Sequence, residues 1–527
     1  MPGQKLRWLT AGLFASAGAG MLSLTSMMNP AFAFGAPEPD PDIGLFVGAS
    51  GLPIPGPDYV EAAYGLYVDP TYPGAITSFY QGTAENPFGN GVFTPEGLYP
   101  LESAGVHQLY LNYPLDANGL PDISSSVGQG ASIVQSTVLG EQAVDDASTV
   151  FGYSQGSTVD GIAMQLLDPS GTPQTGPSDP QFLLIADPSN PNGGLLERFN
   201  GFETTSGQTI VDPLNLPSMG ISFDGATPAD DYTTTIYSLE YDGFADFPRY
   251  PLNFLSDLNA FLGIAELHGT YLNAAGGETG PTPTDIADAV HLTTVGDTLT
   301  NYYMIDTIDG SPVTPPLVSL LGDLPVVGKP LEDLLGPDLT VLINLGYGGD
   351  NLGYSDAPAN VPTPFGLFPD VNPTTLANEL IAGAQSGFEQ FGSDLSNPAA
   401  LLSSLTDFST PSTTSLSGIF TALETDFSSP EAASTTLTDL VNAFSSAAST
   451  AYSTLLPTAD IANALLTSLP AYDVSLFTDN LSTGDLLDAV GLPVAADTGL
   501  VTLAAGFEYD VISNAASQIA GDFAGLF

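Results

Sequence analysis

Residues 149–156, with the sequence TVFGYSQG, decide the fold of this chain. The run begins with apolar and β-branched residues typical of a buried strand, and a helix-compatible segment follows from Ser157 to Leu167. Small residues on both sides of Ser154 let the strand and the helix approach closely. Strand, G-x-S-x-G and helix in this order predict a sharp turn that exposes the hydroxyl of Ser154 as a nucleophile.

Strand-like runs and helix-compatible stretches alternate on both sides of this turn. The expected strands and helices are Ile43–Val47, Pro57–Gly65, Ser124–Ala143, Thr149–Tyr153, Ser157–Leu167, Phe182–Ile185, Thr233–Leu239 and Pro251–Ile264. This alternation predicts an α/β fold, with a parallel sheet that carries helices on both faces. Functional loops should then gather at the carboxyl ends of the strands.

The pattern changes in the second half of the chain. From about Ala274, short apolar pieces and proline-rich turns replace the alternation, and a helix is expected over Leu331–Leu345, packed on the core or covering the site. Residues 361–527 become rich in Ala, Ser, Thr and Leu, and prolines such as Pro430 and Pro457 divide them into short helices. We expect a separate helical region there, a wall-associated or packing module without chemistry of its own.

The N-terminus predicts export. Lys5 and Arg7 precede an uncharged apolar stretch, Trp8–Leu24, and residues 31–33 read Ala-Phe-Ala. This pattern is typical of a signal peptide, here residues 1–33, cut after Ala33. A proline-rich linker over residues 34–42 would follow, and the mature chain is expected to be secreted or envelope-associated, without a transmembrane span.

Charge and composition exclude several classes of function. The chain of 527 residues carries 59 acidic and five basic residues, a formal net charge of -54. Such a surface does not neutralise phosphates, so nucleic acid is not an expected partner. There is no cysteine, which excludes disulfides and thiolate metal sites. No nucleotide or metal motif is present, and no cofactor or metal is expected, although carboxylate-only Ca²⁺ binding stays compatible with so acidic a chain.

A serine nucleophile needs a base, and the base needs an orienting carboxylate. The chain holds three histidines. His107 precedes Ser154 and does not fit the Ser, Asp, His order of hydrolases with this turn, which leaves His268 and His291. We favour His268. Asp246, on the loop that follows the strand ending near Leu239, is the preferred carboxylate, with Asp242 in reserve.

Acyl transfer also requires hydrogen-bond donors for the oxyanion. The backbone N–H of Gln155, directly after the nucleophile, is one expected donor. Ser50 lies in the loop Gly48–Gly51 after the first strand, and its N–H is the expected second donor.

With these residues in view, the chain resembles the PE-PPE domain family of mycobacteria, which is similar to the cutinase-type serine α/β hydrolases. The matching stretches are VGASGLP (47–53), TPEGLYP (94–100), GYSQGS (152–157), PNGGLLERF (191–199), YDGFADFP (241–248), HGTY (268–271), PVVGKP (325–330) and LGYG (345–348). The resemblance implies an α/β-hydrolase domain over residues 43–360 and a Ser154, Asp246, His268 triad. It also implies esterase or acyl-transferase activity at the cell envelope.

The chain departs from that pattern in three respects. A signal peptide stands in place of the N-terminal PE or PPE domain, the disulfides of fungal cutinases are absent, and the interval from the aspartate to the histidine is longer. The leading hypothesis is an exported serine esterase that acts on short-chain, medium-chain or lipid acyl esters. The alternatives are an acyltransferase that moves acyl groups onto envelope glycolipids with the same triad, and a non-catalytic surface protein.

Overall fold

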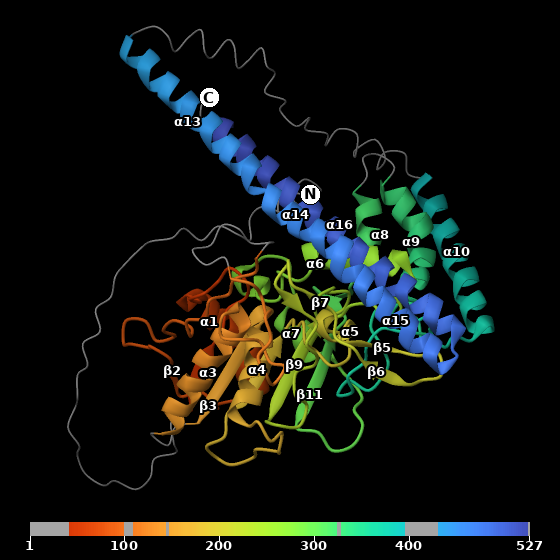
Figure 1. Cartoon of the computed structure of the whole chain (residues 1–527), viewed down its shortest axis with the longest axis horizontal. Coiled ribbons are helices and arrows are strands. Elements are labelled where there is room, and N and C mark those ends of the chain that lie inside the picture. The colour runs from red at the N-terminus through yellow and green to blue at the C-terminus, as the bar shows by residue number, and fades with distance from the viewer. Residues whose placement is uncertain (1–41, 100–108, 144–146, 324–327, 396–429, 525–527) are drawn as a thin grey trace.

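The computed structural model describes residues 42–99, 109–143, 147–323, 328–395 and 430–524 (Figure 1). Its centre is a seven-stranded sheet in the order β10-β11-β9-β4-β3-β1-β2, parallel except for β10. The strands are β1 (Ile43–Phe46), β2 (Ser78–Phe79), β3 (Ser148–Tyr153), β4 (Gln181–Ile185), β9 (Thr234–Leu239), β10 (Val290–His291) and β11 (Thr300–Ile305). The expected α/β fold with a parallel sheet is confirmed.

Alternation along each strand sends side chains to opposite faces of the sheet. On β1, Leu45 joins one buried cluster and Phe46 the other, and Val150 and Phe151 of β3 divide in the same way. Both faces of the central strands are therefore buried, which explains why these strands read as nearly continuous apolar runs.

Helices cover both faces. Helix α3 (Ser126–Gln142) and α4 (Gln155–Leu167) pack on one side through Val134 and Val159. On the other side lie α1 (Pro57–Ala63), the π-helix η2 (Tyr64–Val68) and α9 (Gly328–Asn344). The side chain of Ser125 caps α3 by accepting a hydrogen bond from the N–H of Gly128, which satisfies one free donor of the first turn.

The expected strands and helices before residue 270 agree with the structure to within three residues at each end. Two strands of the central sheet that lie beyond Ala274 were not expected. Strand β11 pairs in parallel with β9 over its whole length, and β10 adds an antiparallel edge. The sequence of β11, TNYYMI, is short and begins with polar residues, so neither strict alternation nor an apolar run indicated a strand there.

Between β4 and β9 the chain builds a layer beside the sheet. It contains α5 (Leu195–Arg198) and two small hairpins, β5 (Gly201–Glu203) with β6 (Thr209–Val211), and β7 (Asn215–Leu216) with β8 (Ile221–Ser222). Helix α6 (Phe254–Glu266) follows β9. Further along are α7 (Pro283–Ala287), the β12 (Thr307–Ile308) and β13 (Ser311–Pro312) hairpin, and α8 (Pro316–Gly322). The short helices α2 (Asp69–Thr71) and η3 (Asn273–Gly276) complete the body.

The C-terminal region is helical, as expected, but its helices are not short. They are α10 (Pro373–Leu395), α13 (Pro430–Ser453), α14 (Leu455–Asn463), the π-helix η4 (Ala464–Ser468), α15 (Leu469–Thr483) and α16 (Leu486–Ala524). Pro430 starts α13 as the sequence indicates, whereas Pro457 lies within the first turn of α14, where its missing N–H costs no hydrogen bond. Pro493 stands inside α16.

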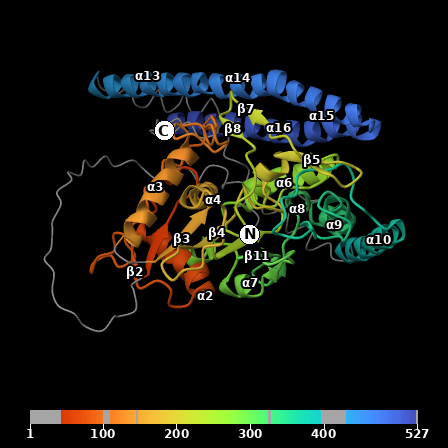
Figure 2. The same cartoon turned by 60° about the horizontal axis from the view of Figure 1, so that its bottom comes forward.

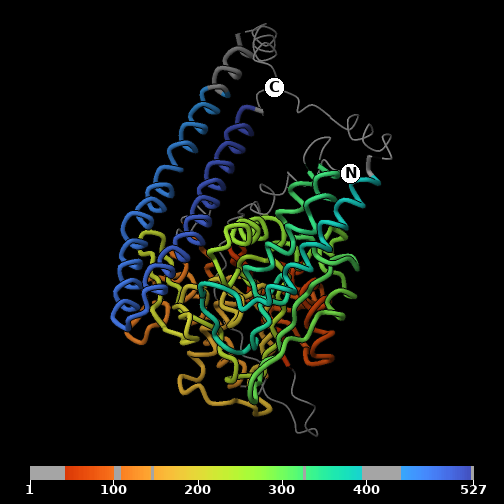
Figure 3. The backbone as a smooth tube through the Cα atoms, turned by 90° about the vertical axis from the view of Figure 1, so that its right-hand side faces the viewer, coloured from red at the N-terminus to blue at the C-terminus, as the bar shows by residue number. Residues whose placement is uncertain are grey.

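Helices α13, α14, η4 and α15 form one long arm that runs antiparallel to α16 (Figures 2 and 3). One end of this pair lies across the body, and the other projects beyond it (Figure 3). Within α16, residues Leu486–Phe523 are long and apolar enough to cross a membrane, yet half of the most apolar window is buried against the rest of the protein. A core helix of a globular protein passes the same test, so the expectation of no transmembrane span stays a prediction.

The body and the C-terminal helices share one hydrophobic cluster. Phe199 and Phe247 from the body pack with Leu492 and Leu500 of α16 and Leu476 of α15. The expected boundary at residue 360 stays a prediction, but in their packing these helices are not separate from the body. Residues 1–33, the predicted signal peptide, and 34–41 of the predicted linker lie outside the described residues.

Candidate active site

Ser154 lies at the turn between β3 and α4, in a backbone conformation with φ 57° and ψ -118°. A positive φ is unfavourable for a residue with a Cβ and costs on the order of 1–3 kcal/mol, which the surrounding structure must offset. The glycines on both sides of Ser154 are required because a side chain would not fit at either position. A Cβ at Gly156 would lie 2.6 Å from the carbonyl oxygen of Gly48, and one at Gly152 would lie 2.7 Å from that of Gly156.

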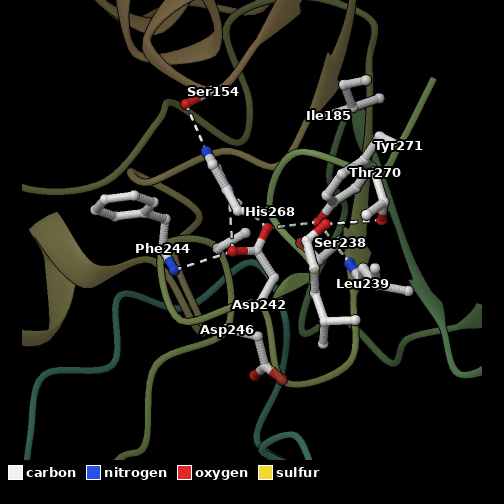
Figure 4. Close-up of polar contacts among 12 residues, drawn as sticks. Ser154, Ile185, Ser238, Leu239, Asp242, Phe244, Asp246, His268, Thr270 and Tyr271 are labelled. Carbon is white, nitrogen blue, oxygen red and sulfur yellow. Dashed lines mark hydrogen bonds and ion pairs between the residues drawn. The ribbon is translucent and has the colours of Figure 1, made fainter. Parts of the chain in front are cut away.

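His268, the expected base, lies beside the serine. Its Nε2 lies 2.6 Å from the Ser154 Oγ (Figure 4). The histidine follows the end of α6, where its backbone N–H donates to the carbonyl of Gly263 and its own carbonyl accepts a hydrogen bond from the Tyr153 hydroxyl. The ring of Phe244 meets the imidazole edge-on, with the ring centres 4.7 Å apart. Backbone and ring are thus both held in place, so the imidazole faces the serine.

The carboxylate at the imidazole is Asp242. Both of its oxygens lie 2.9 Å from His268 Nδ1, and the side chain is fully buried. The hydroxyl of Tyr271 donates to Oδ2 over 2.8 Å, and the N–H of Phe244 donates to Oδ1 over 3.1 Å. These hydrogen bonds satisfy the buried carboxylate oxygens and fix the plane of the carboxylate toward the histidine.

Asp246 is not this carboxylate, which corrects the expectation from sequence. Its Oδ2 accepts the backbone N–H of Tyr241 at 3.0 Å, and the side chain points away from His268 (Figure 4). Burial raises the pKa of Asp246 well above its usual value. The two aspartates share one loop, but a turn in which the Asp246 N–H donates to the Asp242 carbonyl directs their side chains differently.

The two residues expected at the oxyanion site meet beside Ser154. The Ser50 hydroxyl donates to Oε1 of Gln155 over 2.7 Å, and the Gln155 amide donates to the Ser126 hydroxyl over 2.7 Å. Ser50 and Gln155 both line the pocket at Ser154. Within the described residues, neither backbone N–H has a protein acceptor. Gln155 is the first residue of α4, where N–H groups lack helical partners. The oxyanion role itself stays a prediction.

His291 does not reach the site in the described part of the chain. His291 lies on β10, exposed, with its ring against Tyr303. His107 falls outside the described residues. Among those that the structure describes, no cluster of three or more His, Asp or Glu residues is arranged to hold a metal ion.

A narrow apolar pocket opens at the serine. Apart from Ser50, Ser154, Gln155 and Thr158, every residue that lines it is apolar. Part of this lining comes from α14, η4, α15 and α16, including Leu465 and Phe507. These residues were not predictable from the sequence, because nothing in their own spacing distinguishes a pocket wall from an ordinary apolar helix face.

Comparison with known proteins gives the family of this chain. Residues 89–348 match the PE-PPE domain, and no solved structure matches the chain. The uncharacterized PPE family protein PPE28 of Mycobacterium tuberculosis is 40% identical over 98% of this chain and 72% of its own length. Esterase PE16 of the same organism is 36% identical over 62% of this chain, which spans about half of that protein (51%).

A more distant relative is also an enzyme by name. The SL1278 acyltransferase Chp1 of Mycobacterium tuberculosis is 26% identical over 49% of this chain and 61% of its own length. The relatives thus include an esterase and an acyltransferase, which supports a lipolytic or acyl-transfer role. From the identity and coverage of PPE28 and the match to the PE-PPE domain, this chain belongs to the mycobacterial PE-PPE domain family.

Proposed function

We propose that this protein is an exported serine esterase that hydrolyses acyl esters through an acyl-enzyme on Ser154. One observation carries the proposal: Ser154 Oγ, His268 Nε2, His268 Nδ1 and the Asp242 carboxylate form a continuous hydrogen-bonded series at 2.6 and 2.9 Å. A serine hydroxyl becomes nucleophilic when a positioned imidazole accepts its proton and a carboxylate stabilises the resulting cation.

In the first half of the reaction, Ser154 Oγ attacks the ester carbonyl carbon while His268 Nε2 takes its proton. The carbonyl oxygen becomes an oxyanion, which the N–H groups of Gln155 and Ser50 stabilise. The intermediate then collapses. The bond to the alcohol oxygen breaks, the proton on Nε2 passes to that oxygen, and the alcohol leaves the acyl group on Ser154.

Water resolves the acyl-enzyme in the second half. His268 removes a proton from the water, the hydroxide adds to the acyl carbonyl, and collapse returns the proton to Ser154 Oγ as the acid departs. Asp242 stays ionised throughout and holds the imidazole with Nδ1–H toward the carboxylate.

The second candidate is acyl transfer with the same residues, which the likeness to the acyltransferase Chp1 favours. A sugar hydroxyl of an envelope glycolipid would then replace water in the second half. The two reactions differ in the acceptor alone, so analysis of products formed with and without a trehalose-type acceptor distinguishes them.

The direct test is labelling of the purified protein with a fluorophosphonate, read by intact mass beside the Ser154→Ala variant. We expect one adduct on the wild-type protein and none on the variant. An adduct on both, or ester hydrolysis by a folded Ser154→Ala variant, would contradict the proposal. A folded wild-type protein without any adduct would favour a non-catalytic surface protein.

A further inference from the structure

The pocket at Ser154 has two unlike walls. One comes from the body, from residues such as Leu195, Met219 and Phe244, and the other comes from the C-terminal helices. Ile461, Ala464 and Leu465 of α14 and η4 line this pocket together with Leu500, Leu503 and Phe507 of α16. Residues more than 300 positions after the nucleophile thus contact the space in which its substrate must lie.

The dimensions of the pocket favour a thin ligand. Its cavity has a volume of about 100 Å³. This volume is below the range of about 300–1,000 Å³ that is usual for drug-sized ligand sites. The small volume indicates a narrow slot, which fits a chain of methylenes better than a sugar ring.

The distribution of polar groups gives the slot a direction. Ser50, Ser154 and Gln155 belong to the nucleophile turn and the loop that faces it, and Thr158 lies one helical turn further along α4. The C-terminal helices contribute apolar side chains alone to the lining. A bound ester would therefore place its carbonyl at the polar end and its acyl chain against α14, η4 and α16.

Polar contacts hold this wall in place. The Tyr99 hydroxyl donates to the Asp460 carboxylate over 2.7 Å, and the Ser218 hydroxyl donates to the Asp460 backbone carbonyl over 2.8 Å. At the start of α16, Asp488 accepts the backbone N–H and the hydroxyl of Thr205. Helix α14 and the start of α16 are thus both hydrogen-bonded to the body, which holds the C-terminal wall of the pocket in place.

We propose that the C-terminal helices α14, η4 and α16 complete an acyl-chain site, and that they set the length of linear acyl chain the enzyme accepts. This region lies outside the residues 89–348 that match the PE-PPE domain. The inference rests on the proposed function, since the slot selects acyl chains for reaction only if Ser154 is acylated. The substrate class is esters of medium and long unbranched acids, because each methylene buried in the slot improves transition-state binding by about fourfold.

Two adjacent residues of η4 allow a matched test. Leu465 lines the slot, whereas the neighbouring Leu466 is 77% exposed. In the Leu465→Trp variant a larger side chain shortens the slot, so the ratio of kcat/KM for p-nitrophenyl decanoate to that for p-nitrophenyl butyrate should fall at least tenfold. The Leu466→Trp variant adds the same bulk to the surface and should keep the wild-type ratio.

A second variant changes the slot in the opposite sense. Phe507 is partly buried at the wall, and Phe507→Ala widens the slot without inserting bulk, so it should shift the preferred chain length upward by at least two carbons. The Phe507→Ala variant tests the inference even if the Leu465→Trp variant fails to fold, which circular dichroism and Tm would show.

The possible outcomes distinguish a failure of the acyl-chain site from a failure of the proposed esterase activity. If a fluorophosphonate labels Ser154 but Leu465→Trp and Phe507→Ala keep the wild-type chain-length profile, the acyl-chain site is overturned and the esterase remains. If Leu466→Trp changes the profile as much as Leu465→Trp, the effect does not come from the slot, and the inference is again overturned. If Ser154 is unreactive in the folded wild-type protein, the proposed function itself fails.

Discussion

The hydroxyl of Tyr271 connects Asp242 to the sheet. It donates a hydrogen bond to Asp242 Oδ2 over 2.8 Å and accepts one from the backbone N–H of Leu239, the last residue of β9, over 2.7 Å. Tyr271 is fully buried. One side chain therefore positions the carboxylate relative to the strand that carries its loop, although it does not touch the serine or the histidine ring by hydrogen bond.

Tyr271→Phe should lower kcat for p-nitrophenyl butyrate by about tenfold to a hundredfold, with KM nearly unchanged. A hydrogen bond to a charged group is worth about 1.5–3 kcal/mol, and the phenylalanine ring fills the same space. The rate of fluorophosphonate labelling should fall by a similar factor, because it also depends on the oriented imidazole. A loss of Tm with an unchanged labelling rate would instead assign Tyr271 a purely structural role.

The asparagine variants of Asp242 and Asp246 should behave very differently. Asp242→Asn removes the charge that stabilises the imidazolium and reverses the preferred tautomer, so kcat should fall by about 10³ to 10⁴. Asp246→Asn keeps an acceptor for the Tyr241 N–H. Because burial raises the pKa of Asp246, a neutral amide resembles the protonated form of this side chain, and kcat should stay within a few-fold of the wild type.

Both variants would be compared by steady-state kinetics after a check of Tm. Equal losses in two folded variants would contradict the assignment of Asp242 alone. A large loss in Asp246→Asn with full activity in Asp242→Asn would restore the expectation that the sequence favoured.

The nucleophile turn was predictable because its requirements are local. The turn at Ser154 needs a strand before it, a helix after it and glycines beside it, and all of these lie close together in the sequence. Only Gly48, which Gly156 approaches closely, comes from a distant loop. The position of the base was predictable in part, because the Ser, Asp, His order excluded His107 and left His268 and His291. The choice between Asp242 and Asp246 was not, because it depends on hydrogen bonds from Tyr271 and Phe244 that the turn creates.

The apolar slot was unpredictable for a different reason. Leu465 and Leu503 become neighbours of Ser154 through packing between segments about 300 residues apart. Helical spacing identifies which face of each helix is apolar, but it does not say what that face contacts. Strand β11 shows the same limit, since it became part of the sheet by pairing with β9 despite a weak local pattern.

Stability should fall as the pH rises from about 5 to 8. Burial raises the pKa of Asp187 to about 6, of Glu197 and Asp224 to about 7, and of Glu240 to about 8. The folded state therefore binds more protons than the unfolded state between the unfolded pKa values near 4 and these raised values. Ionisation in that window favours unfolding, so Tm should decrease by several degrees, as differential scanning calorimetry would show.

Glu240→Gln measures the contribution of one carboxyl group to this decrease of Tm with pH. The amide oxygen can still accept the N–H of Gly353, which donates to Glu240 Oε1 at 3.0 Å, but it does not ionise. The variant should have a higher Tm than the wild type at pH 8 and a flatter decline. Glu61→Gln removes the same charge from an exposed position and should leave the slope unchanged. Equal slopes in wild type and Glu240→Gln would contradict the prediction.

The Gly506→Ala variant tests the contact between α16 and α6. Intrinsic helix propensity and packing predict opposite signs for its effect on the free energy of unfolding. In an open helix, glycine to alanine stabilises by up to about 1 kcal/mol. A Cβ at Gly506, however, would lie 2.2 Å from the ring of Phe261, a buried residue of α6, so the ring or the helix must move. Gly506→Ala should therefore lower the free energy of unfolding by about 1–3 kcal/mol, the usual cost of overpacking.

Gly521, on the same helix, is the matched control, since nothing lies within 4 Å of a Cβ built there. Gly521→Ala should be neutral or slightly stabilising in urea or thermal unfolding followed by circular dichroism. If Gly506→Ala stabilises as much as Gly521→Ala, α16 does not pack against α6 as closely as described. Because Leu503 and Phe507 flank Gly506 and line the slot, a destabilised contact should also reduce the preference for decanoate over butyrate.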